Sequence, residues 1–326
     1  MPILAIFCDS LHNAADDWRK RQDPVTSAQA RLPVVSGVGR AGFGEVADAA
    51  LDELIFGVAS EALLSAGLKR KDVDYVVIAS SDVHDGRSNS TMTLTGATGS
   101  FRCPELRVCS DSIVALGVAS AALESGLAMR VLVASWSYTA GIDLQTLEAL
   151  ALSPLTRDLL GDGVSAALIR SNESGRPANV EAVRVGGSNS AVAMVLRCPE
   201  AGGPALGRIA GTGWWTDPWV GPSRPNAIAR AIEIATSSAD RRPSEFATVV
   251  TANLHDIADD ELGRLAQVDS ASVHRCGPAA VDVGYAAGLF AVVEALLSHR
   301  DGWQLVVSAI GIRAQSAAAA VVVGKP

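Results

Sequence analysis

Apolar and polar residues follow two periods along this chain, one typical of helices and the other of buried strands. Residues 49–66 place apolar side chains at helical spacing, and Gly67 follows them as a candidate C-terminal cap. Residues 73–81 form an apolar, β-branched run that is typical of a strand covered on both faces. Further predicted elements are strands at residues 3–8, 105–109 and 130–135 and a small-residue helix at 112–127. This alternation favours an α/β fold.

The second half of the chain repeats the first at a constant offset of 173 residues. Val76 and Val77 match Val249 and Val250 at this offset. The other matches are Leu123 with Leu296, Leu132 with Leu305, Val133 with Val306 and Ser135 with Ser308. Two copies of a β-α-β-rich unit would bring equivalent strand ends together around a pseudo-twofold axis. We therefore expect two halves, residues 1–200 and 201–326.

Composition narrows the class of protein. Of the 326 residues, 48% are hydrophobic and 19% are charged, so the chain can bury a substantial core. The net charge of −8 and the lack of a long basic run argue against nucleic acid or an anionic membrane as the partner. The first residues lack a basic n-region, so we expect no signal peptide. Five cysteines without CxxC spacing fit a reducing, cytoplasmic compartment better than disulfides or a metal site.

Cys109 stands where the first copy passes from a strand into a small-residue helix. The repeat offset places Asp282 at the corresponding turn of the second copy. The repeat thus predicts that Cys109 and Asp282 approach each other near the axis.

Six segments, taken in order, resemble the thiolase superfamily and within it the ketoacyl synthase III-like branch. Residues 66–80 look like the family's first central strand, 107–135 like its nucleophile segment and 159–169 like its GDGA turn. Residues 251–266 look like its histidine region, 281–296 like its glycine-asparagine segment and 306–322 like its closing glycine-rich turn. The resemblance implies a layered α-β-α-β-α thiolase fold built from two βαβαβ halves. It also implies acyl transfer through a cysteine thioester, with Cys109 as nucleophile. A thiolate at a helix N-terminus has a lowered pKa, although a buried structural cysteine is the alternative.

The sequence departs from the family pattern at the residues that assist the nucleophile. Asp111 follows Cys109 where the family commonly has glycine, and it either raises the thiolate pKa or caps the helix. Val250 falls at the histidine position of the ketoacyl synthases. A register resembling sterol-carrier-type thiolases offers His255 as the imidazole, with a solvated residue at a helix start as the alternative. His274 is the fallback imidazole.

Three further positions complete the expected site. Asp282 falls at the asparagine position, with the N-cap of the following helix as its alternative role. Asn253 lies in the histidine region, and Gly311 alone remains of the closing glycine-rich run; we expect these two to bind the thioester donor. Residues 211–225, which hold three tryptophans among glycines and prolines, line a pocket or form a dimer-contact loop. Gly161–Gly163 is interpreted as a tight turn rather than a phosphate loop.

The resemblance implies that the protein is an acyltransferase of specialised metabolism. Such an enzyme would move an acyl group from coenzyme A or an acyl carrier protein to a small-molecule alcohol or amine. An ionised aspartate cannot donate a hydrogen bond to an enolate, which favours transfer over condensation. The alternatives are a carbon–carbon condensing enzyme and a degenerate partner subunit of a heterodimer. We expect no metal or redox cofactor, no nucleic acid or membrane partner, and a homodimer.

Overall fold

The structure is a computed structural model of the 326-residue chain. It describes residues 32–41, 51–80, 103–108, 110–137, 190–216, 226–252, 254, 257–276, 284–298, 302–310 and 316–324. All of these belong to one compact unit, Leu32–Pro326. The strand predicted at 3–8 and the turn predicted at 161–163 lie outside the described residues.

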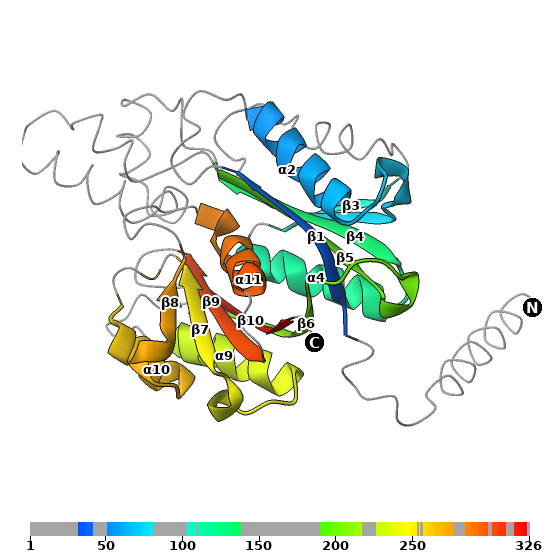
Figure 1. Ribbon diagram of the computed structural model, residues 1–326. Helices are drawn as coiled ribbons and strands as arrows, with labels where there is room; N and C mark the ends of the chain where they lie inside the picture. The colour runs from blue at the N-terminus through cyan, green and yellow to red at the C-terminus, as the bar shows by residue number, and fades with distance from the viewer. Residues whose placement is uncertain are drawn as a thin grey trace, which may run out of the picture. The chain divides into compact units, whose positions relative to one another are not determined.

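Helices and strands alternate along the described chain, as the sequence predicts (Figure 1). The elements of the first half are β1 (Val34–Ala41), α2 (Leu51–Ser65), η2 (Arg70–Asp72), β2 (Tyr75–Ser80), β3 (Glu105–Val108), α4 (Ser112–Glu124), β4 (Arg130–Ser137) and β5 (Ser190–Arg197). After η4 (Pro199–Ala201) follow β6 (Gly207–Thr216), α9 (Asn226–Ser238), η5 (Pro243–Glu245), β7 (Thr248–Ala252), α10 (Asp259–Ala266), η6 (Ser270–Ser272), β8 (Val273–Arg275), η7 (Gly284–Ala286), α11 (Ala287–Leu297), β9 (Trp303–Ile310) and β10 (Ser316–Gly324).

The end of α2 confirms the predicted cap. Gly67 has a φ of 69°, a left-handed conformation that favours glycine. Its N–H donates to the carbonyl of Leu64 at 3.0 Å, and the N–H of Leu68 donates to that of Leu63 at 2.9 Å. These two bonds form a Schellman motif.

The ten described strands pair in the order β3-β2-β4-β5-β1-β6-β10-β9-β7-β8. This order reads as the same five-strand arrangement twice, in opposite directions. The first arrangement ends at β1 and the second at β6. Those two strands pair only where Val34 and Val35 lie opposite Arg208 and Gly207, so strand pairing between the halves is confined to a short stretch.

Strand register confirms the internal repeat. Val77 pairs with Val133 in the first half, and Val250 pairs with Val306 in the second, at the predicted offset. The offset is different for β5 and its counterpart β10. Ser190 of β5 pairs with Ser137, whereas Ser316 of β10 pairs with Ile310. The cause is visible in the sequence: residues 138–189 connect β4 to β5, but only 311–315 connect β9 to β10.

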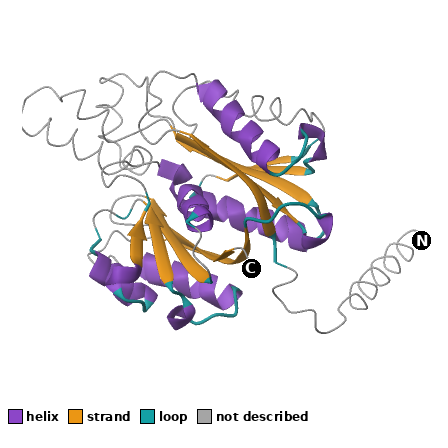
Figure 2. Cartoon of the chain, viewed as in Figure 1, coloured by secondary structure: helices purple, strands orange, loops and turns teal. Residues whose placement is uncertain are grey.

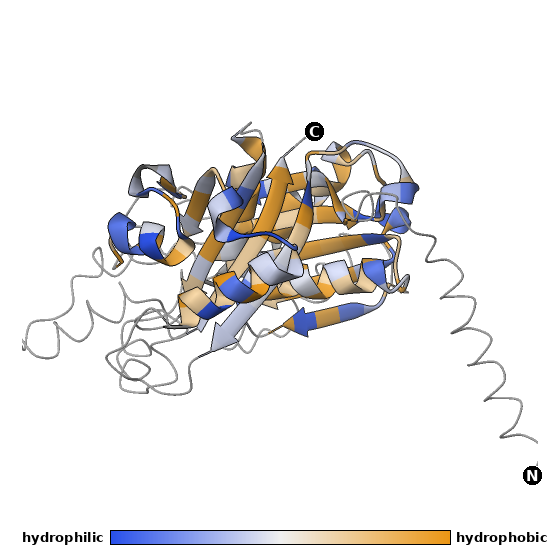
Figure 3. Cartoon of the chain, turned by 90° about the horizontal axis from the view of Figure 1, so that it is seen from below, coloured by the Kyte–Doolittle hydropathy of each residue, from blue (hydrophilic) through white to orange (hydrophobic). Residues whose placement is uncertain are grey.

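The buried side chains divide into three clusters. Figure 2 shows helices between the strands of the two halves and on their outer sides, and in Figure 3 most of the strand residues are coloured as hydrophobic. The central cluster contains α4 and α11 together with inward-facing strand residues from both halves, such as Val77 and Val250. One outer cluster lies between α2 and the first half's strands, and the other lies between α9, α10 and the second half's strands. The layers therefore run helix, sheet, paired helices, sheet, helix.

Two glycine pairs set the distance between the sheets and the outer helices. A Cβ at Gly37 would collide with the carbonyl oxygen of Ala62 in α2, and a Cβ at Gly211 with that of Ala235 in α9. Gly39 and Gly213 are confined in the same way by the same two helices. The short motifs GVG and GTG thus allow equivalent helices to approach equivalent strands in both halves.

The tryptophan-rich segment is described in part, and the two roles considered for it stay predictions. Residues 211–216 belong to β6 rather than to a loop, and they pair along β10. Trp214 and Trp215 sit near the end of that strand and are 49% and 40% exposed. Residues 217–225 lie outside the described residues.

The boundary between residues 200 and 201 stays a prediction, although β5 ends at Arg197 and β6 begins at Gly207. No helix in the described part of the chain combines the length and apolar character needed to cross a membrane.

Candidate active site

The five predicted site residues lie outside the described residues, but the chain next to each is described. They are Cys109, Asn253, His255, Asp282 and Gly311. Their roles therefore stay predictions, and the environment of the candidate site is built from the described neighbours.

The residues around Cys109 form a short connection from a strand to a helix. β3 ends at Val108, and α4 begins at Ser112. Asp111 is the N-cap of α4, and its Oδ1 accepts the N–H of Ile113 at 2.8 Å. Of the two roles considered for Asp111, helix capping is confirmed.

Asp111 also has a partner in the other half of the chain. The Oγ of Ser308, in β9, donates to its Oδ2 at 2.7 Å, and both side chains are buried. Burial raises the pKa of Asp111 to about 6, and the bonds from Ser308 and Ile113 oppose that rise. The carboxyl is therefore largely ionised near neutral pH. Two peptide units keep its Cα within about 7 Å of that of residue 109.

The first turn of α11 meets the first turn of α4. Ala286, the N-cap of α11, makes no side-chain capping bond. The Oγ of Ser112 instead accepts the N–H of Leu289 at 2.8 Å, which satisfies one of the free donors of that turn from the other half. A Cβ at Gly288 would collide with the Oδ1 of Asp111, so this contact requires glycine.

Both roles considered for Asp282 stay predictions. η7 (Gly284–Ala286) runs directly into α11, and Asp282 precedes it in the sequence, outside the described residues. The residues that follow Cys109 and Asp282 in sequence meet each other at Asp111 and Gly288.

The histidine region follows β7. Val250, at the position of the ketoacyl synthase histidine, is buried inside β7. His274, the fallback imidazole, lies in β8 directly opposite Val250 in the parallel register. Residues 255 and 256 lie between Leu254 and Ile257, which are both buried, and α10 starts only at Asp259.

The three thiols in the described part of the chain, those of Cys103, Cys198 and Cys276, are poorly suited to be nucleophiles. Burial raises the pKa of Cys103 to about 11 and that of Cys276 to about 12. Burial also raises the pKa of Cys198, whose Sγ donates to the carbonyl oxygens of Leu123 and Ala128. A high pKa keeps a thiol protonated and unreactive near neutral pH. Across the described ranges, no three His, Cys, Asp or Glu side chains gather in a way that could hold a metal ion.

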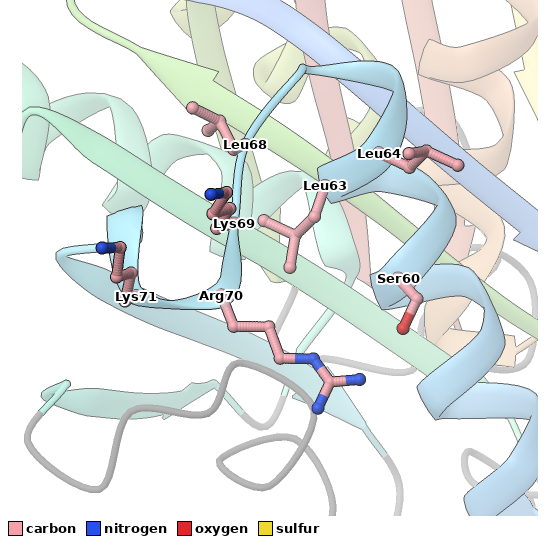
Figure 4. A pocket seen from close by; sticks show the side chains of 7 residues that line it. All are labelled: Ser60, Leu63, Leu64, Leu68, Lys69, Arg70 and Lys71. Carbon is pink, nitrogen blue, oxygen red and sulfur yellow. The ribbon is translucent and has the colours of Figure 1, made fainter.

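A hollow of about 510 Å³ lies at the end of α2 (Figure 4). Its lining residues are Ser60, Leu63, Leu64, Leu68, Lys69, Arg70 and Lys71. This hollow precedes the amino end of β2, whereas Cys109 follows the carboxyl end of β3, which runs parallel to β2. In α/β sheets ligands bind beyond the carboxyl ends of strands, so this hollow is not the candidate active site.

Sequence reasoning missed the contacts that join the halves. The sequence matches Ser308 to Ser135 only as part of the repeat and assigns no role to Ser112 or Gly288. It also assigns none to Arg275, whose contacts lie within the second half. The repeat is the one signal that points to this region, because it places the starts of α4 and α11 at equivalent positions.

Curated relatives match part of the chain. Beta-ketoacyl-[acyl-carrier-protein] synthase III 3 of Streptomyces coelicolor is 28% identical over 164 residues, or 48% of this chain and 46% of that protein. Beta-ketoacyl-[acyl-carrier-protein] synthase III 4 of the same organism is 34% identical over 125 residues, or 37% of this chain and 38% of that protein. The chain thus matches less than half the length of each. No family model matches the sequence.

Solved structures match almost the whole chain in fold. Human mitochondrial 3-ketoacyl-CoA thiolase superposes with a TM-score of 0.63 at 15% identity, covering 92% of this chain and 100% of that one. The peroxisomal 3-ketoacyl-CoA thiolase of Saccharomyces cerevisiae, described as five-layered and built from two core domains of identical topology, gives 0.63 at 14%, covering 92% and 100%. The 3-oxoacyl-(acyl carrier protein) synthase III of Xanthomonas oryzae gives 0.61 at 15%, covering 90% and 99%. The expected layered fold is confirmed.

Proposed function

We propose that this chain, which has the thiolase fold and resembles the ketoacyl synthase III-like branch of that superfamily, is an acyltransferase that works through a thioester on Cys109. The donor is an acyl thioester of coenzyme A or of a carrier protein, and the acceptor is a small-molecule alcohol or amine. The observation that carries the proposal is the turn between β3 and α4. The helix start that follows Cys109 is capped by Asp111 and fixed to the second half through Ser308 and Leu289.

The first half-reaction acylates the cysteine. The Cys109 thiolate attacks the carbonyl carbon of the donor, and the donor's carbon–sulfur bond breaks to release its thiolate. The N-terminus of α4 favours the anionic forms of the cysteine and of the tetrahedral intermediate. Backbone N–H groups at Cys109 and Gly311 are the proposed oxyanion donors, and Asn253 is proposed to bind the thioester donor.

The second half-reaction transfers the acyl group. The oxygen or nitrogen of the acceptor attacks the acyl carbon, and the imidazole of His255 accepts the proton that this hydroxyl or amine loses. The Cys109 thiolate then leaves, and the ester or amide is released. Asp282 orients the imidazole and stabilises its cation.

Carbon–carbon condensation is the second candidate, because the matched relatives are named as ketoacyl synthases. Condensation requires a group that stabilises an enolate, and an ionised Asp282 lacks a donor for it. A homodimer in the cytoplasm and a place in specialised metabolism complete the proposal.

Intact-protein mass spectrometry after incubation with a panel of acyl-coenzyme A and acyl-carrier thioesters tests the proposal. We expect an acyl-sized mass gain in the wild type and in Cys103→Ala, the control, but none in Cys109→Ala. Product analysis then separates an ester or amide from a new carbon–carbon bond. No adduct with any donor would refute both enzymatic candidates and favour the degenerate partner subunit.

A further inference from the structure

Arg275 connects the end of β8 to the segment that follows β7. Its Nη1 donates to the carbonyl oxygen of Leu254 at 2.7 Å, and its Nη2 donates to that of Ile257 at 2.5 Å. Its Nε donates to Oδ1 of Asp259 at 3.0 Å, and Nη2 lies 2.7 Å from the same oxygen. One guanidinium thus holds two backbone carbonyls and one carboxylate.

The two carbonyls stand on either side of His255 in the sequence. The side chains of Leu254 and Ile257 are 1% and 3% exposed and belong to the outer cluster under α9 and α10. A carbonyl group in such a buried connection needs a hydrogen-bond donor, and Arg275 supplies it to both. Packing and hydrogen bonds thus fix the two residues that flank positions 255 and 256 in the sequence.

The geometry requires arginine. Its planar guanidinium directs donors from three nitrogens in fixed directions, whereas lysine offers a single ammonium group. Asp259 is the first residue of α10, and the N-cap Ala258 makes no side-chain capping bond. A carboxylate is favourable at this helix end, and its ion pair with Arg275 ties the start of α10 to β8.

We propose that Arg275 is a positioning residue that holds the segment carrying His255 where its imidazole reaches the acyl acceptor. This inference rests on the proposed function, in which His255 is the base of the transfer step. Catalytic groups must be held within about 0.5 Å of their working geometry. Loosening this segment therefore slows transfer, while acylation of Cys109, which does not use the imidazole, continues.

The kinetic test measures the two half-reactions separately. We expect Arg275→Gln to leave the rate of Cys109 acylation unchanged and to slow transfer from the acylated enzyme by about 10–100-fold. Arg230→Gln is the matched control, because Arg230 makes an exposed ion pair with Glu233 on α9 at 2.6 Å, and it should change neither rate. Adding Arg275→Gln to His255→Gln should cause no further loss.

A second measurement reports on the imidazole directly. The chain has five histidines, so nuclear magnetic resonance of the ¹⁵N-histidine-labelled protein resolves few signals, and the His255 signal is the one lost in His255→Gln. We expect this signal to shift and broaden in Arg275→Gln but not in Arg230→Gln. If Arg275→Gln does not fold, Arg275→Lys replaces it, because lysine keeps the positive charge beside Asp259 but cannot donate to both carbonyls in fixed directions.

An unchanged His255 signal would overturn the inference, and so would a double variant whose loss in transfer is the product of the two single losses. Failure of the proposed function has a different signature. Absence of acylation at Cys109 would refute the acyltransferase, yet a shifted His255 signal in Arg275→Gln would still support positioning of the segment.

Discussion

The hydroxyl of Ser308 donates a 2.7 Å hydrogen bond to the carboxylate of Asp111, which lies 197 residues earlier in the chain. Its repeat equivalent, Ser135, donates instead to the carbonyl of Ala79 on the neighbouring strand at 2.6 Å. Equivalent serines therefore have different roles, since one links two strands of its own half and the other joins the halves. The acceptor of the bond that joins the halves is Asp111, which follows Cys109 by two residues in the sequence.

The buried carboxyl of Asp111 should make stability depend on pH. Its pKa is raised from 3.8 to about 6 in the folded protein, so the folded state holds this proton more tightly than the unfolded state. The resulting stabilisation is complete below pH 4 and is lost as the pH rises through 6, by roughly 3 kcal/mol at most. Denaturation of the wild type and Asp111→Asn from pH 4 to 8 should show this loss in the wild type alone. Parallel curves for the two proteins would contradict it.

Ser308→Ala tests the other partner of the same bond. Removing the hydroxyl removes an interaction that lowers the pKa of Asp111, so the pKa should rise further. The pH range in which stability falls should then move to higher values in Ser308→Ala than in the wild type. The same denaturation series measures it, and a shift to lower pH would show that the hydroxyl does not stabilise the carboxylate.

Gly288→Ala should destabilise the contact between α4 and α11. The new Cβ would collide with Oδ1 of Asp111 and lie 2.6 Å from Cγ1 of Ile113. We expect a loss of about 1–3 kcal/mol in the free energy of unfolding. Gly57→Ala on α2 is the control, because its Cβ meets nothing within 4 Å and should stabilise the helix by about 0.5–1 kcal/mol. Equal effects of the two substitutions in urea denaturation would refute the crowding.

Arg197→Lys should weaken the connection between the halves. The guanidinium of Arg197 donates to the carbonyls of Cys198 and Pro199 at 3.3 Å and to those of Gly203 and Pro204 at 2.8 and 3.1 Å. An ammonium group cannot serve four such acceptors, and unsatisfied buried carbonyls cost about 1–3 kcal/mol each. Thermal unfolding should therefore show a lower melting temperature for Arg197→Lys, and an unchanged one would mean that water replaces these bonds.

Cysteine alkylation should distinguish the candidate nucleophile from the structural thiols. Cys103 and Cys276 have raised pKa values of about 11 and 12, so brief iodoacetamide treatment at pH 7.5 should modify Cys109 before either of them. Peptide mass spectrometry identifies the modified site. Asp111→Asn should speed the reaction of Cys109, because it removes a nearby negative charge that opposes thiolate formation. Prior modification of Cys103 would contradict the assignment.

Local pattern was sufficient for the predicted elements that the structure describes. The helical spacing before Gly67 and the apolar run at 73–81 became α2 and β2, with ends differing by a few residues. The small-residue helix ended at Glu124 rather than at 127, because Gly126 takes a left-handed conformation with a φ of 73°. Such signals are local, since periodicity and capping involve residues within a few positions of one another.

The sequence by itself determined the α/β alternation, the 173-residue repeat and, through ordered motifs, the thiolase fold. A sequence repeat gives information about residues far apart in the chain, because the two copies of the pattern fold into equivalent positions. Only the tertiary structure decided which side chains join the copies. The bond from Ser308 to Asp111 and the contact of Gly288 with the same carboxylate depend on distances of a few ångströms between chain segments far apart in sequence. The bonds from Arg275 to Leu254 and Ile257 lie within the second copy and depend on the packed fold in the same way. Serine, glycine and arginine are common surface residues, and contact with a specific partner, which is a property of the packed fold, gives each of them its role.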